Sequence, residues 1–162
     1  MAQASSNPLD AYRLIDPIGR GSYGSVYRAE TRADGSTVAV KVVPLEEDSE
    51  VQDLTTQVQQ EVETLRRCDS PFVLRYLGSY LFKRRLWLVT ELCEGGSMLE
   101  VLRWQGAPLA EDQIAAVLAD AVAALCHLHE LKMVHQDLKP GNVLMYGPLL
   151  RIADFGLCCT SG

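Results

Sequence analysis

Two hydrophobic periodicities divide this chain near residue 95. Before that point, from Tyr12 onward, apolar residues tend to alternate with polar ones, which is the pattern of half-buried strands. After Gly95-Gly96-Ser97, apolar residues recur every three or four positions, as they do along the buried face of a helix. The pattern predicts a strand-rich first part, a glycine hinge and a helical second part, without internal repeats.

The first part is predicted to hold strands and one helix. Two strands flank Asp34-Gly35, a dipeptide that favours tight hairpin turns, and two more are predicted within residues 72–80 and 81–92. A helix is predicted over residues 51–68, because its apolar residues are spaced by three and four. This stripe consists of Val51, Leu54, Val58, Val62 and Leu65.

The second part is predicted to hold a short helix over residues 98–104, a long helix over residues 111–131 and a small hairpin that turns at Gly147-Pro148. The apolar face of the long helix consists of Ile114, Val117, Leu118, Ala121, Val122, Leu125 and Leu128. Asp120 lies in the middle of this helix, whereas a membrane span is apolar all round. We therefore expect no membrane span.

The composition is that of a soluble globular protein, with 48% hydrophobic and 22% charged residues among 162. A net charge of −6 argues against a nucleic-acid-binding surface. The five cysteines form no C-x-x-C pair, and no basic and apolar leader follows Met1, so we expect a cytoplasmic protein. We expect a flexible tail over residues 1–11, one lobe with its hinge over residues 12–94 and a second lobe over residues 95–162.

The stretch GRGSYGSV contains Gly19, Gly21 and Gly24 in the order G-x-G-x-x-G. Dinucleotide-binding folds use the same spacing, but they need a helix after the third glycine to hold the pyrophosphate. Here β-branched and aromatic residues follow, and then a hairpin turn. The sequence favours a glycine-rich β-hairpin over nucleotide phosphates, with a plain turn-rich hairpin as the alternative.

Lys41 lies on the strand face opposite Val40 and Val42, in the stretch VAVK. Such a lysine can simply face solvent, unless a carboxylate is within reach. At ~100° per residue, Glu61 lies roughly 60° from the centre of the helical stripe and Glu63 roughly 140° from it. Glu61 is therefore the better candidate partner for Lys41.

The stretch HQDLKPGN places Asp137 and Asn142 five residues apart in a loop after the long helix. A carboxylate there can accept a hydroxyl proton, an amide oxygen can bind a cation, and Lys139 adds positive charge for a transferring phosphate. Asp154 in the stretch DFG follows twelve residues later, behind the small hairpin, and offers a second oxygen ligand for magnesium.

These four motifs, in this order, resemble those of the eukaryotic protein kinase family. The resemblance implies an α+β, two-lobed fold with an antiparallel-sheet N-lobe, an incomplete helical C-lobe and ATP in the cleft between them. It implies that Asp137 is the catalytic base, that Asn142 and Asp154 bind Mg²⁺, and that Lys41, paired with Glu61, holds the α- and β-phosphates. The nucleotide contacts it implies are Ile18, Gly19, Gly21, Tyr23, Gly24, Val26, Ala39, Lys41, Thr90, Glu91, Cys93 and Leu144.

Finer features of the sequence also bear on this resemblance. The stretches CDSPFVLRYLGSY and LWLVTELCEGGSM resemble the sterile-twenty-like group, and Lys139 two residues after Asp137 is typical of Ser/Thr kinases. Gln136 replaces an arginine that usually binds a phosphorylated activation loop, so we do not expect switching through this contact, whereas the base and the metal ligands do not depend on it. The later C-lobe helices of the family do not follow Gly162. We therefore expect a truncated domain whose exposed C-lobe face can bind a regulatory protein partner.

Two functions remain open on the sequence. The first is a Ser/Thr protein kinase that transfers a phosphoryl group from Mg-ATP to hydroxyls of a protein substrate. The second is a catalytically impaired ATP-binding or interaction module, resembling a pseudokinase or a competing short form. A dinucleotide-dependent oxidoreductase is excluded by the strand after Gly24. For the chain itself we expect Mg-ATP binding with little peptide phosphorylation.

Overall fold

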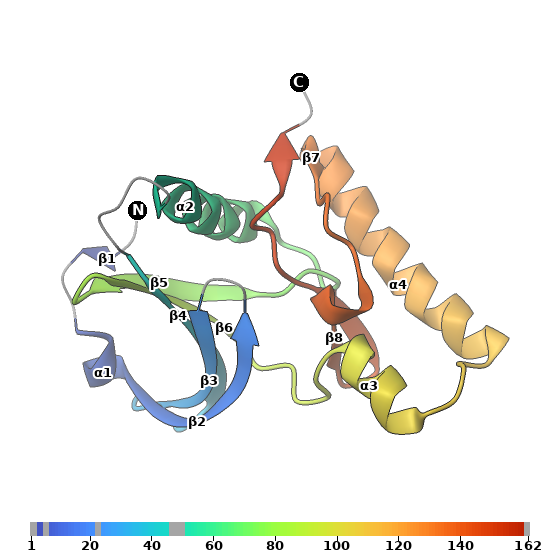
Figure 1. The fold of residues 1–162 in the computed structure, drawn as a ribbon, viewed down its shortest axis with the longest axis horizontal. Coiled ribbons are helices and arrows are strands. Elements are labelled where there is room, and N and C mark those ends of the chain that lie inside the picture. Colours follow the sequence, from blue (N-terminus) through green and yellow to red (C-terminus); the bar gives the residue numbers. More distant parts are fainter. Residues whose placement is uncertain (1–2, 5–6, 22–23, 46–50, 161–162) are drawn as a thin grey trace. The chain divides into compact units, whose positions relative to one another are not determined.

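A computed structural model describes residues 3–4, 7–21, 24–45 and 51–160 of the chain (Figure 1). The chain folds as two compact units. The first comprises Met1–Val62 and Tyr76–Leu92, and the second comprises Glu63–Arg75 and Cys93–Gly162. The first is built on a sheet and the second mainly on helices, so the predicted α+β class is confirmed.

The first unit contains a six-stranded sheet with the order β1-β5-β6-β4-β3-β2 (Figure 1). Its strands are β1 (Gln3–Ala4), β2 (Tyr12–Gly21), β3 (Gly24–Thr31), β4 (Thr37–Pro44), β5 (Tyr76–Phe82) and β6 (Arg85–Glu91). All neighbouring strands are antiparallel except β1 and β5, which are parallel. The predicted antiparallel sheet is therefore present, and it carries one parallel pairing that the sequence analysis does not predict.

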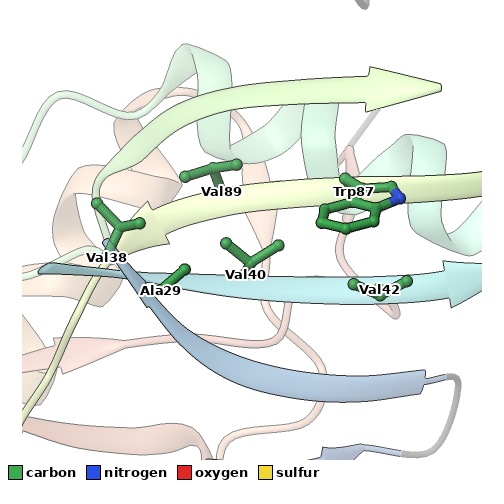
Figure 2. Close-up of a cluster of buried hydrophobic side chains, with 6 residues drawn as sticks. All are labelled: Ala29, Val38, Val40, Val42, Trp87 and Val89. Atoms are coloured by element: carbon green, nitrogen blue, oxygen red, sulfur yellow. The ribbon is translucent and has the colours of Figure 1, made fainter. Parts of the chain in front are cut away.

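The main core of this unit lies on one face of the sheet. It consists of Ala29, Val38, Val40, Val42, Trp87 and Val89 (Figure 2). The predicted alternation along β4 is confirmed, because Val38, Val40 and Val42 are buried together while Val43 packs with Leu86 in a separate cluster. Burial on both faces explains why the β4 stretch is almost continuously apolar.

Helix α2 (Val51–Arg67) ends one residue before the predicted position. Val62 packs against the cluster of Val43 and Leu86, and Leu65 is fully buried. These two residues lie on the predicted stripe. Its other members, Val51, Leu54 and Val58, have side chains outside the described part of the structure.

The N-terminal residues contain a helical turn where the sequence analysis predicts a tail. Helix α1 (Pro8–Ala11) begins after Asn7, whose side-chain oxygen accepts a hydrogen bond from Leu9 N at 3.1 Å. Proline at the first helical position has the required φ and no N–H that would lack a partner. This capped turn is too short to produce a periodic pattern, which is why periodicity does not predict it.

The second unit contains two main helices and two small sheets. These elements are α3 (Met98–Gln105), α4 (Glu111–Glu130), β7 (Met133–Val134), a 3-10 turn (Pro140–Asn142), β8 (Val143–Tyr146), β9 (Leu149–Ile152) and β10 (Cys159–Thr160). The hairpin β8–β9 turns at Gly147, whose φ of 57° suits glycine. Both predicted helices and the predicted hairpin are therefore confirmed.

Helix α3 begins at a reciprocal cap. Ser97 Oγ accepts from Glu100 N at 3.3 Å, and Glu100 Oε2 accepts from Ser97 N at 2.7 Å. Two of the backbone N–H groups that a helix start leaves unpaired are thereby satisfied. The predicted glycine hinge therefore ends at a well-defined helix start.

Helix α4 has one buried side and one exposed apolar side. Ala124 and Leu128 are fully buried, whereas Ile114, Leu118 and Val122 are 43%, 56% and 55% exposed. The predicted apolar face is thus only partly covered within the chain. Among the described helices, none combines the length and the apolar character that a membrane crossing requires.

The carboxylate in the middle of α4 has a structural role. Asp120 Oδ2 accepts a hydrogen bond from Leu150 N of β9 at 3.0 Å. Leu150 itself packs in a core cluster with Met98 of α3 and Val143 of β8. Asp120 therefore ties the β8–β9 hairpin to α4, which explains a charged residue within an apolar helix.

Candidate functional site

The glycine motif lies on a β-hairpin, as predicted. Gly19 on β2 pairs with Val26 on β3, and Gly21 pairs with Gly24. Strand β3 begins at Gly24 itself, where a dinucleotide site would need a helix to begin. A Cβ atom on Gly24 would collide with the carbonyl of Val42 on β4, so this glycine is required by the close approach of two backbones. Tyr23, predicted at the tip of the hairpin, lies outside the described residues.

The ion pair predicted between β4 and α2 is present. Lys41 Nζ lies 2.6 Å from Glu61 Oε2, and the two side chains are 15% and 6% exposed. Glu61 supplies the partner, as the helical-wheel argument predicts for it over Glu63. A nearly buried pair at this distance holds the ammonium group in a defined position, because each charge would lack solvation without the other.

The other predicted nucleotide contacts of the first unit lie on neighbouring strands. Ala39 on β4 pairs with Thr90 on β6, and Val26 on β3 pairs with Lys41. Thr90 is buried, whereas Ile18 on β2 is 41% exposed. Strand register therefore brings four of these residues onto adjacent positions of one sheet.

The remaining predicted nucleotide contacts lie at the end of β6 and in the second unit. Glu91 is the last residue of β6 and pairs with Val38. Cys93 and Leu144 belong to the second unit, where Leu144 on β8 forms a bridge with Ser97. The hinge is tied to β8 by this bridge and by the hydrogen bond from Met145 N to Gly96 O at 2.8 Å.

The loop after β7 holds a carboxylate between two nitrogen donors. Lys139 Nζ lies 2.6 Å from Asp137 Oδ2, and Asn142 Nδ2 donates to Asp137 O at 2.8 Å and to Asp137 Oδ2 at 3.1 Å. The hydrogen bond from Lys139 lowers the pKa of the Asp137 carboxyl below its usual value, and Asn142 adds to this effect. Asp137 is therefore ionised at neutral pH, partly exposed and held in orientation.

His135 connects this loop to the strand before Asp154, a role that the sequence analysis does not assign. Asp137 N donates to His135 Nδ1 at 3.2 Å, so His135 Nε2 carries the proton and donates to Ala153 O at 3.0 Å. The ring is 2% exposed and lies against fully buried Phe155, with ring centroids 5.0 Å apart. Burial lowers the pKa of the His135 imidazole, which keeps it neutral in this arrangement.

The β8–β9 hairpin brings the two predicted metal ligands into the same region. Val143 pairs with Ile152, and Ala153 N donates to Asn142 O at 2.9 Å. Asp154 is the next residue after Ala153, so its backbone lies near that of Asn142. Because Asn142 Nδ2 donates both of its hydrogen bonds to Asp137, the amide oxygen is left to act as an acceptor or ligand. Asp154 has a φ of 63°, an unusual backbone conformation for a residue other than glycine.

These oxygen donors suit a magnesium ion bound with a phosphate substrate. Mg²⁺ prefers oxygen ligands and is commonly held by one or two protein groups together with phosphates and water. Within the described ranges, no cluster of three or more His, Cys, Asp or Glu side chains could hold a metal by itself. The pair Asn142 and Asp154 therefore fits a shared metal–phosphate site better than a closed protein site.

Comparison with known proteins identifies this arrangement. The model of the protein kinase domain matches residues 12–161. The chain belongs to the protein kinase domain family. It is similar to the protein named serine/threonine-protein kinase cst-1 from Caenorhabditis elegans, with 36% identity over 151 residues. The match covers 93% of this chain but only 29% of the length of that relative.

The cysteines of this kinase domain lie outside the groups just described, apart from Cys93 at the hinge. All five are reduced, and Cys126 on α4 is exposed. Cys158 is 1% exposed, and burial raises the pKa of its thiol. Burial also raises the pKa of Cys68 to about 11. Cys68 and Cys158 therefore behave as small apolar residues and are poor nucleophiles.

The first unit of the kinase domain also has an open hollow of about 430 Å³, lined by residues 10–12 and 31–34. None of the predicted site residues lines it. Its walls at Asp34 and Arg32 are exposed, and Asp34 already accepts a hydrogen bond from Ser36 N at 3.0 Å. This hollow is a surface feature of the β3–β4 turn.

Proposed function

We propose that the protein containing this chain is a Ser/Thr protein kinase, which transfers the γ-phosphoryl group of ATP to serine and threonine hydroxyls of protein substrates. The observation that carries the proposal is the position of Asp137, ionised and oriented between Lys139 and Asn142. A carboxylate in this state can orient a substrate hydroxyl and accept its proton. The relative named a Ser/Thr kinase supports the substrate class, as does Lys139 two residues after Asp137.

The first unit would bind the nucleotide. Lys41, held by Glu61, donates to the α- and β-phosphates, and the backbone of the glycine hairpin covers them. The hairpin glycines are Gly19, Gly21 and Gly24, and Tyr23 is proposed as a nucleotide contact from its place in the motif alone. The residues of this unit proposed to contact the base and sugar are Ile18, Val26, Ala39, Thr90 and Glu91; Cys93 and Leu144 of the second unit are proposed as further contacts.

The second unit would carry out the transfer. Asn142 and Asp154 bind magnesium, and the metal neutralises charge on the phosphates when it is bound. Lys139 moves its hydrogen bond from Asp137 to an oxygen of the transferring phosphate. His135 acts as a positioning residue, because it links the backbone of Asp137 to that of Ala153.

Finer assignments belong to the same proposal. Residues 12–94 would form the N-lobe with the hinge, and residues 95–162 would form part of the C-lobe. The stretches noted above support placement in the sterile-twenty-like group, and the cysteine usage supports a cytoplasmic protein. Gln136 stands where the family usually has an arginine, which supports the proposal that no phosphorylated activation loop is bound at this position.

A second candidate function is an ATP-binding interaction module with impaired catalysis. The observation that favours it is the exposed apolar side of α4, where Ile114, Leu118 and Val122 are each at least 43% exposed. A regulatory protein partner that covers this face would bury these side chains.

Isothermal titration of the 162-residue chain with Mg-ATP, followed by a phosphoryl-transfer assay on a basic protein rich in serine, tests both candidates. We expect binding that Lys41→Met weakens at least tenfold, and weak transfer that Asp137→Asn abolishes. Asp112→Asn, an exposed change on α4, is the control. Binding without any transfer favours the second candidate. Absence of ATP binding in a folded sample contradicts both.

A further inference from the structure

The outer edge of strand β5 is only partly occupied. On one side, β5 pairs with β6 from Tyr76 to Phe82. On the other side, among the described residues, only Tyr80 and Leu81 have strand partners, which are Gln3 and Ala4 of β1 (Figure 1). Within the described ranges, no strand pairs with the remaining β5 residues on this side, and such an edge can accept a further strand.

The residues of β5 do not protect this edge. Natural edge strands are usually blocked by charged side chains, proline or bulges. The sequence of β5, YLGSYLF, has no charge and no proline, and its one irregularity lies at its start, between Tyr76 and Gly78. The segment is uncharged, and three of its seven residues are aromatics with high strand propensity, so it can accept another strand.

Apolar side chains are exposed along the same edge. Leu81 is 51% exposed and Leu77 is 43% exposed. Tyr80 and Phe82, which alternate with Leu81, pack against the core cluster of the first unit, so Leu81 lies on the opposite face. The pairing with Ala4 leaves half of Leu81 uncovered, and a longer strand with larger apolar residues would cover more of it.

Three cations mark one end of the edge. Lys83, Arg84 and Arg85 are exposed, and Lys83 and Arg84 have φ values of 49° and 57°, which form a two-residue turn directly after β5. Because β1 runs parallel to β5, the C-terminal end of a strand seated in this way points toward these cations. Acidic residues at that end would be attracted to them.

A second copy of the chain fits this edge poorly. In an antiparallel pair of β5 edges, the cations of residues 83–85 would approach Arg75 of the other copy, and in a parallel pair they would approach each other. Both arrangements place like charges together, which is destabilising. The charge distribution therefore favours an acidic occupant over another copy.

We propose that the outer edge of β5 is a docking site for an extended segment of a partner protein. The segment runs parallel to β5, carries alternating β-branched residues, ends in acidic residues and displaces β1. Backbone hydrogen bonds provide most of its affinity, while Leu81 and the three cations select its side chains. The site requires no nucleotide, so its test is independent of the proposed kinase activity.

The probe is an acetylated, fluorescein-labelled octapeptide of alternating valine and threonine that ends in two glutamates, with binding followed by fluorescence anisotropy. We expect saturable binding that Leu81→Lys weakens at least tenfold. Leu118→Lys on α4 is the matched control, because Leu118 is similarly exposed, and it should leave binding unchanged. A peptide ending in two lysines, or with proline at its centre, should bind at least fivefold more weakly.

Two further measurements locate the site. Removal of residues 1–6 should strengthen binding severalfold, because β1 no longer competes for the edge. Amide hydrogen exchange should slow within β5 on peptide binding, and sedimentation should show a monomer throughout. Failure to bind, binding that is insensitive to Leu81→Lys, protection confined to α4, or a dimer that Leu81→Lys dissociates would each overturn the proposal.

Discussion

The ion pair between Lys41 and Glu61 is expected to be a main determinant of the stability of the first unit. The informative change is Glu61→Gln, which removes the charge and keeps the size and helix propensity of the side chain. Glu63→Gln is a matched control, because it makes the same change two residues along the same helix at an exposed position.

The structure allows the magnitude to be worked out. At 2.6 Å and an effective dielectric constant of ~20, the Coulomb attraction between Lys41 and Glu61 is about 6 kcal/mol before desolvation is subtracted. Removing one partner of a buried pair costs about 3–5 kcal/mol, and the 15% exposure of Lys41 favours the lower end. We expect Glu61→Gln to lower the free energy of unfolding by ~3 kcal/mol and Glu63→Gln by less than ~0.5 kcal/mol.

Urea unfolding measured by tryptophan fluorescence provides the assay. Trp87 is buried in the core of the first unit, whereas Trp104 on α3 is 90% exposed, so a Trp104→Phe background leaves one probe of the relevant unit. With a slope of ~2 kcal/mol per molar urea, a loss of ~3 kcal/mol moves the midpoint by about 1.5 M.

A double-mutant cycle separates the pair from other effects of each substitution. Lys41→Met combined with Glu61→Gln should be less destabilising than the sum of the two single changes, because neither variant side chain leaves a buried charge unpaired. Equal losses for Glu61→Gln and Glu63→Gln, or a coupling energy below ~0.5 kcal/mol, would refute the reasoning.

Three further predictions follow from the second unit. Asp120→Ala leaves Leu150 N without its acceptor and should lower the free energy of unfolding by about 1.5–3 kcal/mol in urea titrations. Asp120→Asn keeps an oxygen acceptor at this position and should cause a smaller loss. Burial holds the pKa of His135 in the folded chain below its value in the unfolded chain, so on acidification the unfolded chain takes up a proton first. The free energy of unfolding should therefore fall between pH 7.5 and pH 5.5. His135→Asn should make this pH dependence weaker. Iodoacetamide at pH 8 should label exposed Cys126 well before buried Cys158, as followed by peptide mass spectrometry, and equal rates would contradict the burial argument.

Much of the fold and part of the candidate site can be predicted from the sequence, because both rest on short-range patterns. The valines of β4 alternate, and the residues of α2 repeat every three or four positions, so each element and its buried side follow from neighbouring residues. The same periodicity predicts that Glu61 pairs with Lys41. The hairpin turn at Asp34-Gly35 follows from a dipeptide preference.

Other features depend on contacts between segments that are distant in the sequence. The role of Asp120 becomes visible only when the β8–β9 hairpin packs on α4, thirty residues later. The hydrogen bond from Asp137 N to His135 is local, but the one between His135 and Ala153 O forms only when the residue that follows β9 lies beside the ring. The parallel pairing of β1 with β5 has no sequence signal, since two residues are too short to show a period.

The sequence by itself determined which elements form, which faces they bury and which residue types are available for phosphoryl transfer. Local periodicity, turn preferences and motif spacing are properties of neighbouring residues, and they do not depend on distant segments of the chain. Only the tertiary structure decided how Asp137 is oriented, how Asn142 and Asp154 come together, and which edge of the sheet stays open. These depend on strand register and side-chain packing between distant segments, which no local pattern encodes.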